Sequence, residues 1–144
     1  MYTTFKTLHS YWAYLLLVIL LLAVFNALFG ILKRREYTAR DFRIALFALI
    51  ISHIQFLLGL VLYFISPLFD LWSQGGVMGD AEKRLMLVEH PSINIIALIL
   101  ITIGYSKHKK KVSSTSKFKT VLIFYIIGLV FLLSRIPWDV WPNW

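Results

Sequence analysis

The sequence contains no cysteine. Disulfide bonds, c-type haem attachment and thiolate metal sites all require cysteine, so these three are excluded. Acidic residues are also scarce, with 7 Asp and Glu against 15 Lys and Arg, and the net charge is +8. The chain has no long internal repeat. Outside its apolar segments it has no group of residues typical of a soluble catalytic centre, so an independent enzyme activity is not expected.

Apolar residues dominate what is present, at 59% of the 144 residues. A soluble domain of this size could not bury so much apolar surface. Four long apolar runs account for it, and the first three exceed the roughly 20 residues with which a helix crosses about 30 Å of hydrocarbon. The sequence therefore predicts an all-α fold, an integral membrane four-helix bundle, in one domain over residues 1–144. The expected helices are 11–32, 44–66, 85–105 and 118–136.

Local signals predict where these helices begin and end. Thr38 followed by Asp41 is a plausible cap for the second helix, and Asp80 or Glu82 can begin the third. Ser66-Pro67 should end the second helix, because proline disfavours helix at the residue before it. The first apolar run is too long for a signal-peptide core and no small-residue cleavage site follows it, so we expect it to be retained.

The distribution of basic residues predicts an orientation. Two short loops hold eleven of the 15 Lys and Arg, namely Lys33, Arg34, Arg35, Arg40 and Arg43 in the first and Lys107, Lys109, Lys110, Lys111, Lys117 and Lys119 in the other. Short loops rich in Lys and Arg stay cytoplasmic. Both termini should then lie on the outer side of the membrane, which for a bacterial inner membrane is the periplasmic side. Nucleic-acid binding is not expected from this arrangement.

The tryptophans fit the same orientation. All five should lie on the outer side, where they suit a membrane interface: Trp12, Trp72, Trp138, Trp141 and Trp144.

Three histidines in or beside the apolar segments are the most informative polar residues. Counting from the cytoplasmic ends at about 1.5 Å per residue places His53 about 15 Å deep, His90 about 25 Å and His9 about 36 Å, at the outer interface. Ionisable side chains inside a membrane are costly and mark functional sites. Iron ligation or proton relay is the functional interpretation for His53 and His90, and a neutral histidine bonded to a carbonyl is the alternative. His108 lies in a lysine run and is expected to be solvated.

The same count places Glu89 and Arg135 at nearly equal depth, about 27 and 24 Å. Buried ionisable groups normally pair or line a cavity, so we expect these two side chains to lie near each other. The alternative is that both reach the headgroups separately.

The estimated depths do not decide which two histidines could bind the same haem iron. Two axial ligands of one haem place their nitrogens about 4 Å apart, twice a bond of roughly 2 Å. The straight-helix count separates His53 from His90 by about 10 Å and His90 from His9 by about 11 Å. Helix tilt and a bend at Pro91 would narrow either gap. An outer copper or zinc site from His9, Glu89 and His90 is a weaker alternative, without tight ligand spacing.

Polar and small residues lie on single faces of two helices. Helix 44–66 has such a face, and His53 points about 100° away from it; its residues are Ser52, Gln55, Gly59, Tyr63 and Ser66. In the third helix, His90 and Asn94 share one side with small or apolar residues, namely Ala97, Ile101 and Gly104. Such faces favour close helix contacts in lipid. Asn26 is also expected at a helix contact.

Several short motifs resemble a family of small bacterial four-helix membrane proteins labelled cytochrome-b-like. They cover most of the chain: His9-Ser10, His53-Ile54-Gln55 through Gly59, Glu89-His90-Pro91, Ile103-Gly104-Tyr105-Ser106-Lys107 and Ile136-Pro137-Trp138. The resemblance implies b-type haem and electron transfer, with quinone as a candidate partner. His53 and His90 are then the first choice as ligands and His9 a third candidate. Arg135 is a hypothetical partner of a haem propionate, from its charge and depth.

Two other functions compete with the electron carrier. One is a non-catalytic accessory subunit of a larger inner-membrane complex or a homo-oligomer, which the two-faced second helix and aromatic tail fit. A small transporter ranks last, because paired broken helices are absent. With three plausible ligand histidines, where di-haem cytochromes b present four, one haem is the most that this chain can hold alone.

Overall fold

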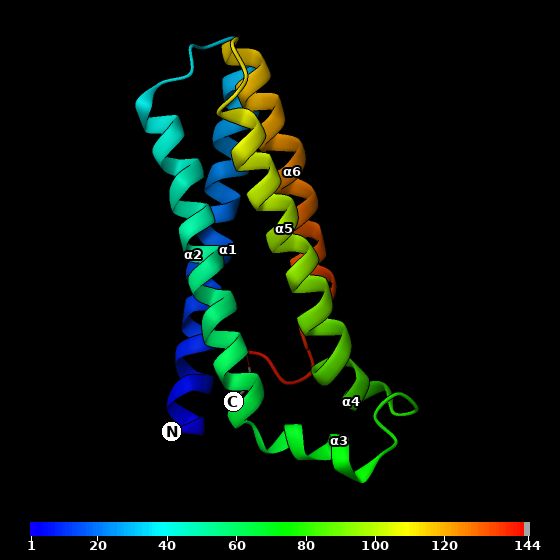
Figure 1. The fold of residues 1–144 in the computed structure, drawn as a ribbon. Helices are drawn as coiled ribbons and strands as arrows, with labels where there is room; N and C mark the ends of the chain where they lie inside the picture. Colours follow the sequence, from blue (N-terminus) through cyan, green and yellow to red (C-terminus); the bar gives the residue numbers. More distant parts are fainter. Residues whose placement is uncertain (143–144) are drawn as a thin grey trace.

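The computed structural model describes residues 1–142, which form helices and connecting loops without any strand. Helices make up 81% of the structure. Four of them are long (Figure 1): α1 Tyr2–Leu32, α2 Ala39–Ile65, α5 His90–His108 and α6 Ser114–Ser134. The short helix α4, Ala81–Arg84, and the π-helix η2, Leu85–Glu89, run into α5 without a break and lengthen it to Ala81–His108.

All four long helical segments are long and apolar enough to cross a membrane. The expected all-α fold, with four helices that could each span a membrane, is therefore confirmed. All four helical segments begin earlier than expected, at Tyr2, Ala39, Ala81 and Ser114. Tyr2–Ser10 joins α1 because neither Gly nor Pro interrupts it, and α2 begins at Ala39, directly after its cap.

The predicted helix caps are confirmed. The Asp41 carboxylate accepts hydrogen bonds from the backbone N–H and the hydroxyl of Thr38, at 2.8 and 2.9 Å, at the start of α2. Ser66 ends α2 in an extended conformation before Pro67. Asp80 caps α4 by accepting from the N–H groups of Glu82 and Lys83. Each cap satisfies N–H groups that have no partner inside the helix.

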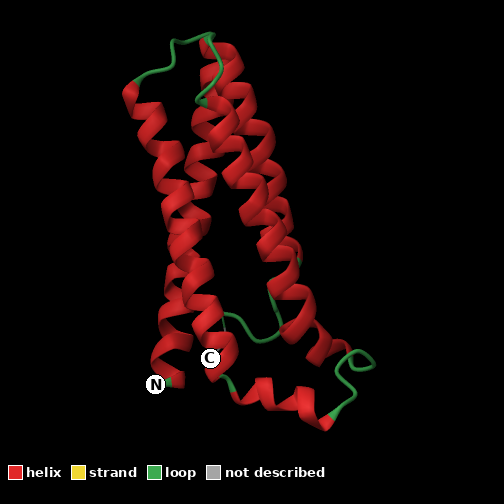
Figure 2. Cartoon of the chain, in the orientation of Figure 1, coloured by secondary structure: helices red, strands yellow, loops and turns green. Residues whose placement is uncertain are grey.

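The long helices run side by side, as Figures 1 and 2 show. Helix α1 packs against α2 and α6, and α5 packs against α6 and contacts α2. The loops 33–38 and 109–113 lie together at one end, which we call the basic end. The N terminus lies at the other end, which we call the histidine end. There η1 (Pro67–Asp70) and α3 (Leu71–Gln74) lead from α2 toward α4.

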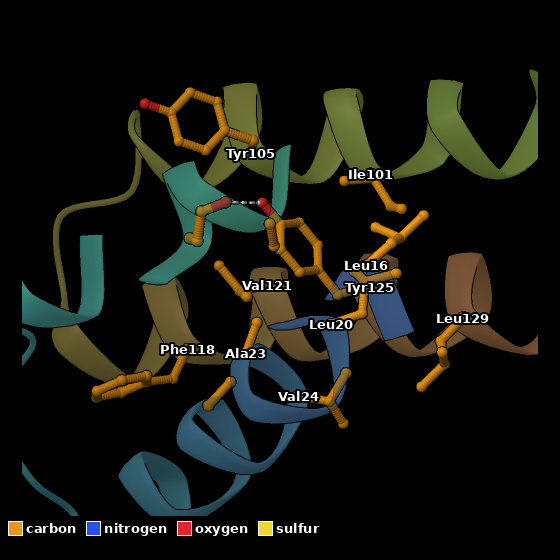
Figure 3. Packing of buried hydrophobic residues seen from close by; sticks show 13 residues of the cluster. Leu16, Leu20, Ala23, Val24, Ile101, Tyr105, Phe118, Val121, Tyr125 and Leu129 are labelled. Atoms are coloured by element: carbon orange, nitrogen blue, oxygen red, sulfur yellow. Dashed lines mark hydrogen bonds between the residues drawn. The ribbon is translucent and has the colours of Figure 1, made fainter. Parts of the chain in front are cut away.

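The buried apolar core is concentrated in the half of the molecule toward the basic end (Figure 3). Its members come from all four long helices: Leu16, Leu20, Ala23, Val24, Ala27, Ala45, Ala48, Ile101, Tyr105, Phe118, Val121, Tyr125 and Leu129. The Tyr125 hydroxyl crosses this core and donates to the Ala45 carbonyl at 2.7 Å, which ties α6 to α2. A Cβ on Gly128 would lie 2.8 Å from Ile101, so this glycine permits close packing of α5 and α6.

His108 is fully buried, so the expectation that it is solvated is wrong. Its Nδ1 donates to the Tyr105 carbonyl, and the Tyr37 hydroxyl donates to its Nε2 at 2.8 Å. The sequence neighbours of His108 are lysines, but α5 continues through it and turns it inward. It follows Ile101 and Gly104 on the buried face, at spacings of 3 and 4.

After α6 the chain turns back toward α1. The Trp141 ring packs on Tyr14 of α1 with centroids 4.6 Å apart, and Trp138 packs on Trp141. Trp138 also donates to the Leu133 carbonyl at 3.1 Å. Trp144, which we expect at the outer interface, lies outside the described residues.

Candidate functional site

His9 of α1 and His90 of α5 lie next to each other at the histidine end. Their ring centroids are 6.3 Å apart and the ring planes are inclined by 77°. The straight-helix count had separated the two residues by about 11 Å. That count assumed parallel helices, whereas α1 and α5 are inclined to each other (Figure 1).

Helix α2 fixes the position of His9. The Gln55 amide donates to the His9 carbonyl at 3.0 Å and lies 3.4 Å from its Nε2. A Cβ on Gly59 would lie only 2.9 Å from Cε1 of the His9 ring. The polar-and-small face predicted for this helix therefore does meet a neighbouring helix, and glycine at position 59 gives the imidazole its room.

Several polar atoms of this site are buried without a hydrogen-bond partner among the described residues. They are Nδ1 of His9, Oε1 of Gln55 and Oδ1 of Asn94. Buried polar groups are normally satisfied, and an unsatisfied one costs about 1–3 kcal/mol. Three such atoms beside one histidine pair indicate a site that is completed by a ligand or by water.

Glu89 lies between two arginines, one residue before His90. Its carboxylate accepts from Arg135 Nε at 3.1 Å and from Arg84 Nε at 2.9 Å. The predicted pairing of Glu89 with Arg135 is confirmed. The sequence did not indicate Arg84, because its spacing of five from Glu89 does not bring side chains together in an α-helix. It does so across the wider turn of the π-helix η2.

Pro91 explains part of the irregular backbone before α5. A proline has no N–H, so the Leu87 carbonyl lacks the partner that an α-helix would supply four residues later. The Tyr63 hydroxyl donates to that carbonyl at 3.1 Å, and Trp72 Nε1 donates to Tyr63 at 3.0 Å. These bonds tie α2 and α3 to the segment that positions His90.

His53 lies on the exposed side of α2, and within residues 1–142 it makes no hydrogen bond or ring contact with His9 or His90. Its Nδ1 donates to the Leu49 carbonyl at 2.9 Å, within its own helix. The structure thus brings together two of the three histidines singled out in the sequence. Arg135 joins them through a backbone contact, since its carbonyl accepts from His90 Nδ1 at 2.8 Å.

A second polar cluster lies at the basic end. The buried Asp41 carboxylate accepts from both Nη atoms of Arg35 and from the Asn26 amide, each at 2.8 Å. These hydrogen bonds to Asp41 raise the pKa of Arg35. Burial raises the pKa of Tyr37, whose hydroxyl therefore stays protonated and donates to His108. This cluster joins α1, α2 and α5 and has a structural role, as expected for Asn26.

No group of three or more His, Cys, Asp or Glu side chains in residues 1–142 is arranged to hold a metal ion. The alternative copper or zinc site is not assembled, because the Glu89 carboxylate binds arginines. A metal ion bound by His9 and His90 would need further ligands from outside this pair, such as those that a haem ring supplies to its iron. No family model, curated protein or solved structure matches this chain.

Proposed function

We propose that this protein is an inner-membrane electron carrier that holds one b-type haem between His9 and His90. The observation that carries the proposal is the histidine pair itself. If His9 and His90 held one iron between them, each through a bond of about 2 Å, their ring centroids would lie about 6 Å apart. The separation of 6.3 Å between His9 and His90 agrees with that value. The unpartnered Nδ1 of His9 also supports the fit.

The two histidines come from different helices, as in haem sites built inside helical membrane proteins. His90 Nδ1 donates to the Arg135 carbonyl at 2.8 Å, so Nε2 is the ring nitrogen that carries the lone pair. A hydrogen bond from the other ring nitrogen fixes the orientation of a ligand histidine and increases its basicity. His90 is therefore prepared to act as a ligand.

Arg135 and Arg84 are the residues of this chain that suit the haem propionates. Both guanidinium groups pair with Glu89, the residue before His90. The single Glu89 carboxylate neutralises one of the two positive charges, so one remains in excess. Paired guanidinium donors are well suited to carboxylates. When bound, the haem supplies one-electron redox chemistry, while ligation, burial and nearby charge set its potential.

The arrangement of charge supports an orientation with both termini outside the cytoplasm. The two basic loops share one end of the molecule, and the N terminus lies at the other. In that orientation the histidine site lies in the outer half of a bacterial inner membrane, where a membrane quinone is the candidate electron partner.

A second function is favoured by His53. A histidine on the exposed side of an apolar helix is costly in lipid, and Phe47 and Leu57, exposed by 55% and 58%, share the exposed surface of α2. Contact with another membrane protein or a second copy of this chain would remove His53 from lipid. The protein would then be an accessory subunit without its own cofactor.

The test is a reduced-minus-oxidised absorption spectrum of the detergent-purified protein, with pyridine-haemochrome quantification. We expect a b-type signal near one haem per chain, abolished in His9→Ala and His90→Ala and retained in His53→Ala. Loss in His53→Ala with retention in His9→Ala would restore His53 as the partner of His90. A folded but colourless protein, purified after expression with ample haem, would rule out the haem proposal and favour the accessory subunit.

A further inference from the structure

Asn94 contacts the one nitrogen of His90 that can bind a metal. His90 Nδ1 lies 2.8 Å from the Arg135 carbonyl, and because a carbonyl oxygen only accepts, Nδ1 carries the proton of the neutral ring. Nε2 then has the lone pair. The Asn94 amide, one turn later on α5, donates to this nitrogen at 3.0 Å.

The end of α6 is the reason why this protonation state is fixed. Helix α6 ends at Ser134, and Arg135 leaves the helical conformation with φ −129° and ψ 23°. The last carbonyls of a helix have no N–H partner within it and form its partially negative end. The Arg135 carbonyl therefore accepts the Nδ1 proton of His90, and Nε2 is left without a proton.

The Asn94 side chain is only half satisfied. Its Oδ1 is buried and has no hydrogen-bond partner in residues 1–142, whereas its Nδ2 has His90. Ligation of iron by His90 would use the same lone pair that now accepts from Asn94. The two interactions exclude each other, since a nitrogen lone pair directed at a metal cannot also accept a hydrogen bond.

We propose, building on the function proposed above, that Asn94 competes with haem iron for Nε2 of His90 and thereby limits the affinity for haem. His90 would hold the haem through the Nε2 lone pair, and the Asn94 amide would then lose its acceptor. The proton stays on Nδ1, which still donates to the Arg135 carbonyl, so His90 releases no proton. Asn94 is thus a positioning residue, which holds the ring in place until haem arrives.

Competition predicts the sign of a mutational effect. Asn94→Leu keeps the approximate volume but removes the donor, so the haem-free state loses a hydrogen bond while the haem-bound state loses nothing. Haem-free protein in detergent micelles is titrated with ferric haem b and followed at the Soret band. We expect the affinity to rise about fivefold, the equivalent of one ordinary hydrogen bond. The control is Thr102→Val, also on α5, where the hydroxyl donates to the Leu98 carbonyl at 2.7 Å within the helix.

An unchanged or lower affinity in Asn94→Leu would overturn the competition, because a side chain that only packs against His90 weakens binding when it is replaced. Wild-type protein that binds no haem would instead overturn the function proposed above, and the competition with it. The two failures are therefore distinguishable.

A second measurement needs no haem. In haem-free protein with ¹⁵N-labelled histidine, His90 should show a protonated Nδ1 and a hydrogen-bonded, unprotonated Nε2. In Asn94→Leu the Nε2 resonance should move to the position of a free lone pair while the Nδ1 resonance stays. An Nε2 resonance that is unaffected by the substitution would remove the hydrogen bond on which the competition depends.

Discussion

Replacing Asp41 by asparagine should destabilise the protein more than any change to its exposed charges. The Asp41 carboxylate accepts five hydrogen bonds, two from Arg35, two from Thr38 and one from Asn26. An asparagine keeps one oxygen and directs an NH₂ group at donors. The variant thus loses bonds at the start of α2, at α1 and at the connecting loop together.

The magnitude follows from burial. Removing one partner of a buried ion pair costs about 3–5 kcal/mol, because the other charge is left uncompensated. The Asp41 side chain is 0% exposed, but that of Arg35 retains 28% exposure, so water recovers part of the loss. We therefore expect Asp41→Asn to lower the free energy of unfolding by about 2–3 kcal/mol.

The assay is reversible unfolding in mixed micelles with increasing sodium dodecyl sulfate, followed by circular dichroism. Glu36→Gln is the matched control, because it removes the same charge from an exposed residue of the loop that leads into α2. It should change stability by less than about 0.5 kcal/mol. The double variant Arg35→Met, Asp41→Asn should recover part of the loss, since the unpaired cation is gone. A loss no larger than that of the control would refute the reasoning.

Three further outcomes are expected. Gly59→Ala should weaken haem binding by about 1–3 kcal/mol, the usual cost of overpacking, because its Cβ would lie 2.9 Å from the His9 ring. The control is Gly79→Ala, where a Cβ would have no neighbour nearer than 3.8 Å. This control should bind haem as the wild type does in the same Soret titration. Tyr125→Phe should lower the free energy of unfolding by about 1 kcal/mol, because it removes the bond from α6 to α2, and equal unfolding curves would contradict this. Hydrogen bonds from the first turn of α4 hold the pKa of Asp80 below its usual value. This cap is therefore intact near neutral pH and is lost as the pH falls through the folded-state pKa. Hydrogen-exchange protection of the α4 amides should fall with acid in the wild type and not in Asp80→Asn.

Helix content and part of the site were accessible from sequence because they depend on local composition. Long apolar runs, the Thr38 and Asp80 caps and Ser66-Pro67 predicted the helices and several of their ends. The pairing of Glu89 with Arg135 was accessible because both residues could be placed at the same depth. Depth is a reliable guide where two helices run nearly parallel, as α5 and α6 do over their length.

The histidine pair was not accessible because it depends on how α1 and α5 are inclined to each other, which a straight count ignores. The π-helix η2 was not anticipated either, and it brings Arg84 onto Glu89. His108 was misjudged for another reason. Its lysine neighbours suggested solvent, but the face that contains Ala97, Ile101 and Gly104 reaches His108 at the next spacing of four. Periodicity was the better guide there.

The uneven distribution of the core has a mechanical consequence. The basic end holds the apolar core and the Asp41 and His108 clusters, so the four helices are clamped there. The histidine end lies outside this core and is held by polar contacts between helices and by aromatic contacts such as Trp141 on Tyr14. The basic end is therefore the more rigid part of the bundle, and His9 and His90 lie at the less tightly packed end. We expect amide hydrogen exchange to be slowest near the basic end and fastest near the histidine end. The helices can then separate at the histidine end to admit a flat ligand while the fold is kept.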